Sequence, residues 1–140
     1  MPDLGGIRTV GDLSDVVKLL THLEGMGVIS PFGLRIKEGG LLDDDYTVLL
    51  NEAERDRRVH DYFAALSELD RRPKQKVRKE DFQIFETMSG KTTRLSYVTG
   101  CHMARKIEEQ CGIETLRDLV KKGHEDFFRA YREVENPLSR

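Results

Sequence analysis

The stretch Tyr97–Tyr131, with the sequence YVTGCHMARKIEEQCGIETLRDLVKKGHEDFFRAY, decides the expected fold. Gly112 and Gly123 divide it into three segments, and apolar residues recur at helical spacing in each segment. Glycine is common where a helix ends, because it adopts a left-handed backbone conformation without steric cost. The stretch therefore predicts a helix that ends at Gly112, followed by short helices over Glu114–Lys122 and Glu125–Val134.

The preceding part of the chain also has mainly helical periodicity. Helices are predicted over Thr9–Glu24, Asp44–Asp70 and Lys79–Met88, and the helix of about 27 residues that starts at Asp44 is expected to be the long central helix of the fold. Thr9 and Asp12 have the spacing of a capping box at the start of the first helix. The predicted fold class is therefore all-α, a multi-helix bundle that forms a single domain over residues 1–140.

A minor β-ribbon is the one departure that the sequence suggests. Gly25 and Gly27 mark an expected end of the first helix, and two short segments of residues 28–37 could pair across a turn at Pro31. Leu34–Lys37 supplies the only apolar-polar alternation in this region. The ribbon is therefore a minor addition to a helical fold.

Composition and charge exclude several classes of protein. The length of 140 residues suits one hydrophobic core, and a formal net charge of −2 provides no general attraction to nucleic acids or anionic membranes. No apolar run approaches the roughly 18 residues that a membrane-spanning helix needs, and the first residues do not resemble a signal peptide. We therefore expect a cytoplasmic protein without a membrane partner.

The two cysteines, Cys101 and Cys111, suggest no disulfide. They lie ten residues apart in one predicted helix, so a rise of about 1.5 Å per residue separates them by roughly 15 Å. A disulfide needs Cα atoms within about 7 Å. Both are expected to be reduced, packed thiols.

The segment Arg71–Lys79, with the sequence RRPKQKVRK, carries six basic residues in nine. Such a run suggests a nucleic-acid contact, but it lacks the aromatic residues that stack on bases. A solvated linker is the better interpretation. Nucleic-acid binding through Arg71–Lys79 stays open as an alternative.

The histidines do not form a zinc-peptidase motif. An H-E-x-x-H helix places two imidazoles on one face with a glutamate beside them. His124 is followed by Glu125, but Phe128 stands where the second histidine is required. The other three histidines also lack a histidine partner at that spacing: His22, His60 and His102.

Other catalytic motifs are also absent from the sequence. No G-x-S-x-G nucleophile motif occurs, and no glycine-rich phosphate loop is followed by Lys and Ser or Thr. Adjacent carboxylates occur at Glu108–Glu109 and Asp43–Asp45. Such groups are usually solvated or cap a helix, so no catalytic residue is assigned.

Two segments nevertheless resemble a known family. The run LLTHLEGMGV at Leu19–Val28 is similar to the region after the catalytic helix of gluzincin-type H-E-x-x-H zinc metallopeptidases. Tyr97–Glu108, with the sequence YVTGCHMARKIE, then Gly112, Leu116 and the run FFRAY at Phe127–Tyr131 resemble the C-terminal helices of putative zinc-dependent peptidases of that group. This second match covers about a quarter of the chain.

The resemblance implies a metal-ligand role for Glu24 alone. In the family, a glutamate followed by glycine and an apolar residue provides the third zinc ligand. The H-E-x-x-H motif that would precede it does not occur in the residues before Glu24. Because catalytic zinc needs about three protein ligands, no cofactor is expected here unless a partner chain supplies further zinc ligands.

The sequence thus favours a non-catalytic or catalytically incomplete helical domain that resembles the C-terminal half of a zinc metallopeptidase. Such a domain would act through self-association, as a homo-oligomer, or through a protein partner. The alternatives are a metallopeptidase fragment that needs a missing N-terminal half, and a weak nucleic-acid binder. An enzymatic role is left open, and the absence of a complete motif weighs against it.

Overall fold

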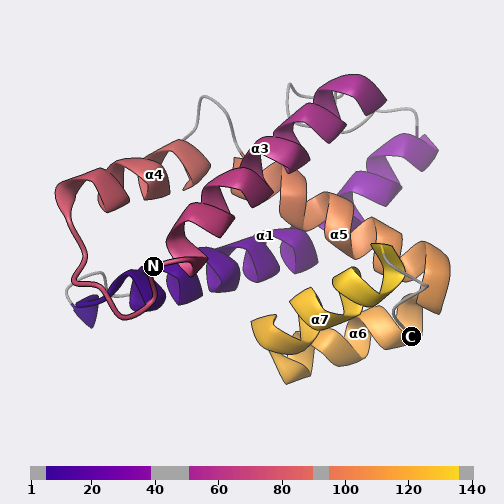
Figure 1. Ribbon diagram of the computed structural model, residues 1–140. Helices are drawn as coiled ribbons and strands as arrows, with labels where there is room; N and C mark the ends of the chain where they lie inside the picture. The colour runs from indigo at the N-terminus through magenta and orange to yellow at the C-terminus, as the bar shows by residue number, and fades with distance from the viewer. Residues whose placement is uncertain (1–5, 39–50, 90–94, 136–140) are drawn as a thin grey trace.

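The computed structural model describes residues 6–38, 51–89 and 95–135, and side chains are considered within residues 6–24, 51–89 and 95–135. Six α-helices form the regular structure of these residues, together with an isolated antiparallel bridge between Thr9 and Lys76. Figure 1 shows that the helices pack as a bundle rather than as an extended array. The predicted all-α, multi-helix fold class is therefore confirmed.

Helix α5 (Leu95–Cys111) is the centre of the bundle and contacts each of the other five described helices. In Figure 1 it runs between α3 above and the pair α6 and α7 below. A surrounded helix needs apolar or small residues on most of its circumference. The sequence meets this need, because ten of its residues are buried: Leu95, Ser96, Val98, Thr99, Gly100, Cys101, His102, Met103, Ala104 and Ile107.

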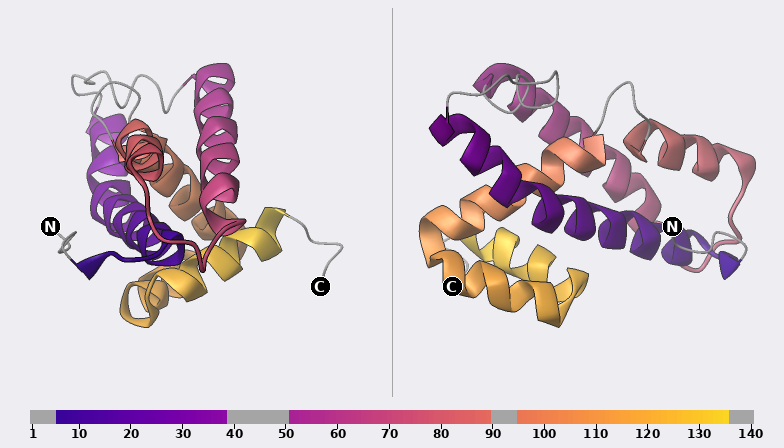
Figure 2. Two further views of the ribbon diagram at one scale, coloured as in Figure 1. Left: turned by 60° about the vertical axis from the view of Figure 1, so that its left-hand side comes forward. Right: turned by 180° about the vertical axis from the view of Figure 1, so that it is seen from behind.

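Helix α1 (Val10–Glu38) lies across α5, as Figure 2 shows from behind. The predicted capping box is confirmed at its start. The backbone N–H of Asp12 donates to Oγ1 of Thr9 at 3.2 Å, and the N–H of Thr9 donates to Oδ2 of Asp12 at 3.1 Å. Two amide groups that the first helical turn leaves free are thereby satisfied.

The predicted end of this helix near Gly25 and the β-ribbon at residues 28–37 are wrong. The backbone continues as α-helix to Glu38 and includes Pro31. The alternation that suggested the ribbon covers only Leu34–Lys37, and an isolated two-stranded ribbon is marginal in water. An interior glycine costs a helix only about 1 kcal/mol, so glycines alone do not end it.

Helix α3 (Glu52–Asp70) has 19 residues and begins after Asn51, whose Oδ1 accepts the N–H of Glu54 at 3.1 Å. Asn51 has an extended backbone, with φ −92° and ψ 103°. A continuous helix over Asp44–Asp70 is therefore wrong, and residues 44–50 lie outside the described residues. Asparagine is among the best N-cap residues, which explains why the helix begins here. The central position belongs to α5 instead.

The Tyr62 hydroxyl joins α3 to α1. It lies 2.8 Å from Oγ1 of Thr21, and this Oγ1 also lies 2.8 Å from the carbonyl oxygen of Val17. Because Thr21 donates its only hydroxyl proton to that carbonyl, Tyr62 is the donor in the first bond. At the other end of α3, Asp70 accepts hydrogen bonds from Ser14 and Lys18 of α1.

Helix α4 (Lys79–Ser89) follows the linker after α3, and the linker pairs with the residues around the start of α1. The N–H groups of Val10 and Gly11 each lie 2.9 Å from a linker carbonyl, those of Gln75 and Pro73 respectively. A Cβ on Gly11 would lie 2.9 Å from the oxygen of Pro73, so this contact requires glycine.

Helices α6 (Ile113–Lys122) and α7 (His124–Glu135) complete the bundle, and their bounds match the predicted segments within two residues. Gly112 and Gly123 lie at the predicted helix ends and have positive φ angles of 90° and 102°. Their ψ angles of 163° and −178° place them in an extended region open mainly to glycine, rather than in the left-handed helical region. None of the described helices has the length and apolar character needed to cross a bilayer.

Candidate functional site: a charged cleft at His102

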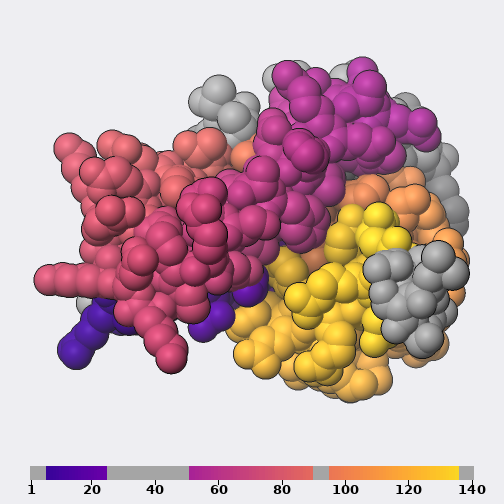
Figure 3. Space-filling view, in the orientation of Figure 1, coloured from indigo at the N-terminus to yellow at the C-terminus, as the bar shows by residue number. Residues whose placement is uncertain are grey.

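The surface of α3, α5 and α7 encloses a cleft with His102 at its middle. Figure 3 shows α5 exposed between α3 and α7 on this face of the molecule. The cleft has two adjoining cavities of about 250 and 480 Å³, which share Arg55, His102 and Lys106. We call the smaller one the basic part and the larger one the acidic-aromatic part. Together they form the candidate functional site.

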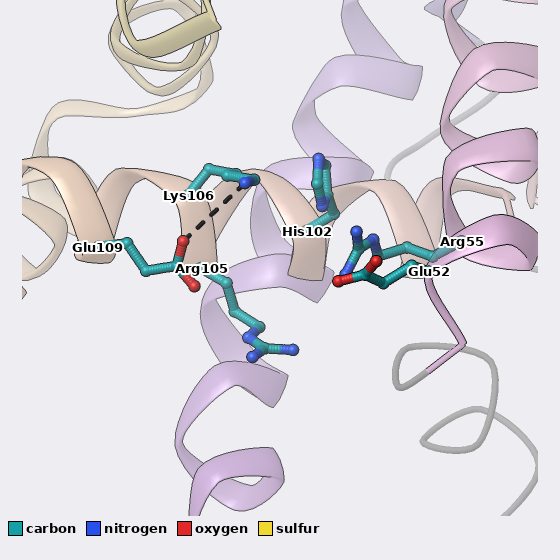
Figure 4. Close-up of a pocket in the computed structure, with 6 residues that line it drawn as sticks. All are labelled: Glu52, Arg55, His102, Arg105, Lys106 and Glu109. Atoms are coloured by element: carbon teal, nitrogen blue, oxygen red, sulfur yellow. Dashed lines mark ion pairs between the residues drawn. The ribbon is translucent and has the colours of Figure 1, made fainter.

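The basic part lies between α3 and α5 and is lined by charged residues around His102. They are Glu52, Arg55, Arg105, Lys106 and Glu109. Figure 4 shows Glu52 and Arg55 reaching from α3 towards His102, and Lys106 and Glu109 further along α5. Residues of helices far apart in sequence thus converge on one hollow.

Arg55 and Lys106, two cations of the basic part, are each paired with an exposed carboxylate. Nε and Nη2 of Arg55 each lie 3.2 Å from Oδ1 of its neighbour Asp56, and the Arg55 side chain is 17% exposed while that of Asp56 is 65% exposed. Nζ of Lys106 lies 4.0 Å from Oε2 of Glu109, which is the limit for an ion pair. Exposed pairs of this kind contribute about 0–1 kcal/mol. A bound anion could therefore compete for both cations at small cost.

The acidic-aromatic part adds α7 to the lining. It carries the carboxylates Asp56 and Glu135 and the rings Phe63 and Tyr131. The rings of Phe63 and Tyr131 are parallel to within 1°, with centroids 5.8 Å apart, and Tyr131 meets His102 edge to face at 6.0 Å. Val59 and His60 complete this cavity. The result is an aromatic wall with carboxylates beside it.

The basic part exerts a positive field on His102. Burial is the main reason that the pKa of His102 falls to about 4, and the charges of Arg55, Lys106 and Arg105 lower the pKa further. The charge of Asp56 acts in the opposite direction and raises the pKa of His102. His102 is therefore neutral at neutral pH, and a nearby anion would raise its pKa.

The field has the opposite sign at Tyr131. Burial raises the pKa of Tyr131, the charges of Glu135 and Asp56 and a hydrogen bond with Glu135 raise it further, and Arg55 alone acts against them. His102 and Tyr131 are neighbours in the same cleft. The nearby charges therefore act with opposite sign on these two neighbours, mainly positive at His102 and mainly negative at Tyr131.

Apart from His60 and Glu109, which line the cleft, the remaining residues considered from the sequence lie away from it. Glu24 lies on α1, and its charge contributes to raising the pKa of Tyr62, for which burial is the main cause. Within the described residues, no group of three or more His, Cys, Asp or Glu side chains could hold a metal ion. The described part of the chain thus assembles no zinc site around Glu24, and its ligand role stays a prediction.

His22 has a structural position. Its Nε2 lies 3.1 Å from the carbonyl oxygen of Leu119, so this nitrogen carries the proton, and its ring lies 4.9 Å from that of Phe127. Burial is the main cause of a lowered pKa. His22 thereby joins α1 to both α6 and α7. His124 lies at the start of α7, and His60 is exposed on α3.

The cysteines are free, as predicted, but only one of them is packed. Cys101 is buried, and burial raises the pKa of its thiol to about 11, which makes it unreactive at neutral pH. Cys111 is exposed at the end of α5, so its prediction as a packed thiol is wrong. Glu108 and Glu109 lie near this end of α5, and Asp43–Asp45 lie outside the described residues.

The basic linker contains a buried ion pair that the sequence did not predict. Nη2 of Arg72 lies 2.7 Å from Oδ1 of Asp81, whose side chain is 0% exposed. The N–H of Arg78 donates to Oδ2 of the same carboxylate at 2.9 Å. Burial by itself would raise the pKa of Asp81, but these bonds outweigh it and lower the pKa below its usual value. Arg72 therefore serves the fold.

Sequence reasoning missed the cleft because its residues come from three helices. Arg55 and Asp56 look like surface charges of an amphipathic helix, and Lys106 and Glu109 look like an ordinary pair on another helix. His102 was singled out, but only as a metal-ligand candidate. Nothing in its spacing indicated that Arg55 and Tyr131 lie beside it.

The chain matches no protein-family model, no curated protein and no solved structure. The resemblance to gluzincin-type peptidases therefore stays a prediction, and the cleft is interpreted from its own chemistry.

Proposed function

We propose that this chain is a non-catalytic helical domain that acts through a protein partner, and that its His102 cleft binds an acidic group of that partner. The observation that supports the proposal is the convergence of Arg55, Lys106 and Arg105 on the basic part of the cleft. The carboxylates paired with Arg55 and Lys106 are exposed and hold these cations weakly, so a carboxylate of the partner can take their place.

The dimensions and lining of the basic part favour a partner side chain over a small-molecule ligand. Small-molecule pockets usually have roughly 300–1,000 Å³ and mostly apolar walls. The basic part has about 250 Å³ and a lining of charged residues with one histidine. That volume suits one or two side chains from the surface of another protein.

The chemistry of the titratable groups favours binding over catalysis. A general base works best with a pKa near the operating pH, whereas the pKa of His102 lies at about 4. The nearby Tyr131 also has a pKa raised away from neutrality, mainly by burial. In this proposal His102 forms part of the cleft floor and transfers no proton at neutral pH.

A capped hexaglutamate peptide tests the proposal by fluorescence anisotropy at low salt. Wild-type protein is compared with the double variant Arg55→Gln/Lys106→Gln. The matched control, Lys74→Gln/Lys76→Gln, removes the same charge from the exposed linker. We expect the cleft variant to bind about tenfold more weakly, or about 1.4 kcal/mol, and the control to change by less than about twofold.

An NMR titration of the His102 ring locates the bound peptide. The peptide carboxylates should raise the pKa of His102 from its value of about 4, and they should leave the lowered pKa of His22, which lines neither part of the cleft, unchanged. The proposal would be contradicted if both double variants bound the peptide equally weakly, or if the wild-type protein did not bind it.

A further inference from the structure

The two parts of the cleft share Arg55 and Lys106 and differ in the other charges of their lining. The basic part adds Arg105, Glu52 and Glu109, and the acidic-aromatic part adds Asp56 and Glu135 beside the stacked rings of Phe63 and Tyr131. Asp56 and Glu135 are therefore the carboxylates that a cationic group of a ligand would complement. A purely acidic ligand would leave the second part without a complement.

We propose that the cleft recognises a dipolar segment of the partner, with an acidic side chain in the basic part and a lysine or arginine side chain in the acidic-aromatic part. The proposal rests on the proposed function and specifies the partner that this function requires. It makes the cleft selective for the order of charges along a segment, rather than for negative charge alone.

The acidic-aromatic part has both features that a long cationic side chain uses. Lysine and arginine pack their aliphatic stems on apolar surface while the charged end stays near water or a carboxylate. The partly buried Val59 and Phe63 provide the surface, with the buried Tyr131 stacked on Phe63, and Asp56 and Glu135 provide the carboxylates. A cation near an aromatic face also gains about 0.5–1 kcal/mol at an exposed site.

The contact between Arg55 and Asp56 joins the two parts. Their side chains pair with each other at 3.2 Å, so a ligand that binds both parts separates this pair and complements each member. A ligand with only an acidic group binds Arg55 and leaves Asp56, whose side chain is 65% exposed, to water at small cost. A dipolar ligand gains an additional contact with Asp56, which is the physical reason to expect selectivity.

Capped peptides with one glutamate and one lysine, separated by one, two or three glycines, test the inference. The matched peptides replace lysine by glutamine, or glutamate by glutamine. Affinities are measured by NMR titration of wild-type protein at constant ionic strength. With the best spacing, we expect the Glu-Lys peptide to bind about five- to tenfold more tightly than its Glu-Gln match.

The double variant Asp56→Asn/Glu135→Gln should remove the preference for lysine. It should also bind the Glu-Gln peptide at least as tightly as the wild type does, because Arg55 is freed from Asp56. The matched control is Glu114→Gln/Asp118→Asn, which neutralises two exposed carboxylates on α6. It should keep the wild-type preference.

The outcomes separate the inference from the proposed function. Equal affinities for the Glu-Lys and Glu-Gln peptides would overturn the dipolar inference and leave the acidic-partner function standing. Preference for the Gln-Lys peptide, or no binding of any glutamate peptide, would overturn both. Loss of the lysine preference in the α6 control would also overturn the inference, because the effect would then come from overall charge.

Discussion

The basic linker and the His102 cleft, both within the described residues, differ in how their positive charges are paired. In the linker of residues 71–79, Arg72 forms a short ion pair with the fully buried Asp81. In the His102 cleft, Arg55 and Lys106 pair with exposed carboxylates at 3.2 and 4.0 Å. The continuous run thus contributes an internal contact of the fold, whereas the residues brought together from separate helices remain accessible to a partner.

The difference teaches that a local density of charge in the sequence is a poor guide to a binding site. Burial and pairing decide whether a cation can meet a ligand. A buried pair is strongly disrupted when one partner is removed, whereas an exposed pair contributes little to stability. Changes in the linker pair should therefore alter stability more than changes in the cleft pairs.

The largest expected effect is the loss of the buried carboxylate in Asp81→Asn. This change leaves Arg72 without its anion and weakens the start of α4, so we expect the free energy of unfolding to fall by about 3 kcal/mol. Urea denaturation measures it. The control Glu80→Gln removes an exposed charge from the same helical turn and should change stability by less than about 0.5 kcal/mol.

If Asp81→Asn lowered the free energy of unfolding by less than about 1 kcal/mol, the linker and the cleft would no longer differ in how strongly their cations are held. The linker pair would then resemble the exposed pairs of the cleft. The assignment of Arg72 to the fold would have to be withdrawn, and the linker would again be a candidate for ligand binding.

The pH dependence of stability is expected to distinguish the linker from the cleft. The pKa of His102 is about 4 in the folded protein and near 6.5 when unfolded, so the unfolded chain binds more protons between these pH values. Stability should therefore fall by about 2 kcal/mol as the pH is lowered from about 6.5 to 4. Asp81 has a lowered pKa, so its contribution is lost only below its unfolded value of 3.8.

Urea denaturation at a series of pH values checks this order. The variant His102→Gln should flatten the dependence above pH 4, apart from a contribution from His22, whose pKa is also lowered mainly by burial. If the dependence of stability on pH were the same in His102→Gln as in the wild type, protonation of His102 in the folded protein would carry no cost in stability.

Gly11→Ala tests the close approach of the linker to α1. The added Cβ would lie 2.9 Å from the backbone oxygen of Pro73, so the linker must shift. Alanine favours the helix by up to about 1 kcal/mol, but the clash should exceed this gain and lower stability by about 1 kcal/mol overall. Thermal unfolding measures the change. A more stable variant would indicate that the linker moves freely and is not part of the packed fold.

The smallest effect on stability is expected for the exposed cations themselves. Lys106→Gln in the cleft and Lys74→Gln in the linker should each change the free energy of unfolding by less than about 0.5 kcal/mol. Only the cleft variant should weaken binding of the acidic peptide. A comparable loss of binding in Lys74→Gln would place the ligand site on the linker after all.

The helical fold could be predicted because its signals are local. Spacing of apolar residues indicated the helices from Lys79 onwards, and Gly112 and Gly123 indicated two helix ends. The errors at Gly25 and Asp44 have one cause. Helix boundaries depend on competing local terms of about 1 kcal/mol, and glycines or acidic residues alone do not decide them.

The sequence by itself determined the fold class, the main helices and the lack of an internal disulfide, because periodicity and chain geometry act over a few residues. Tertiary structure alone decided that α5 is central, that Arg72 reaches Asp81, and that Arg55, His102 and Tyr131 share one cleft. These relations depend on how helices pack in three dimensions. Neighbours distant in sequence set how deeply a side chain is buried and which charges surround it. Burial and surrounding charge in turn determine which charged residues remain available to a partner.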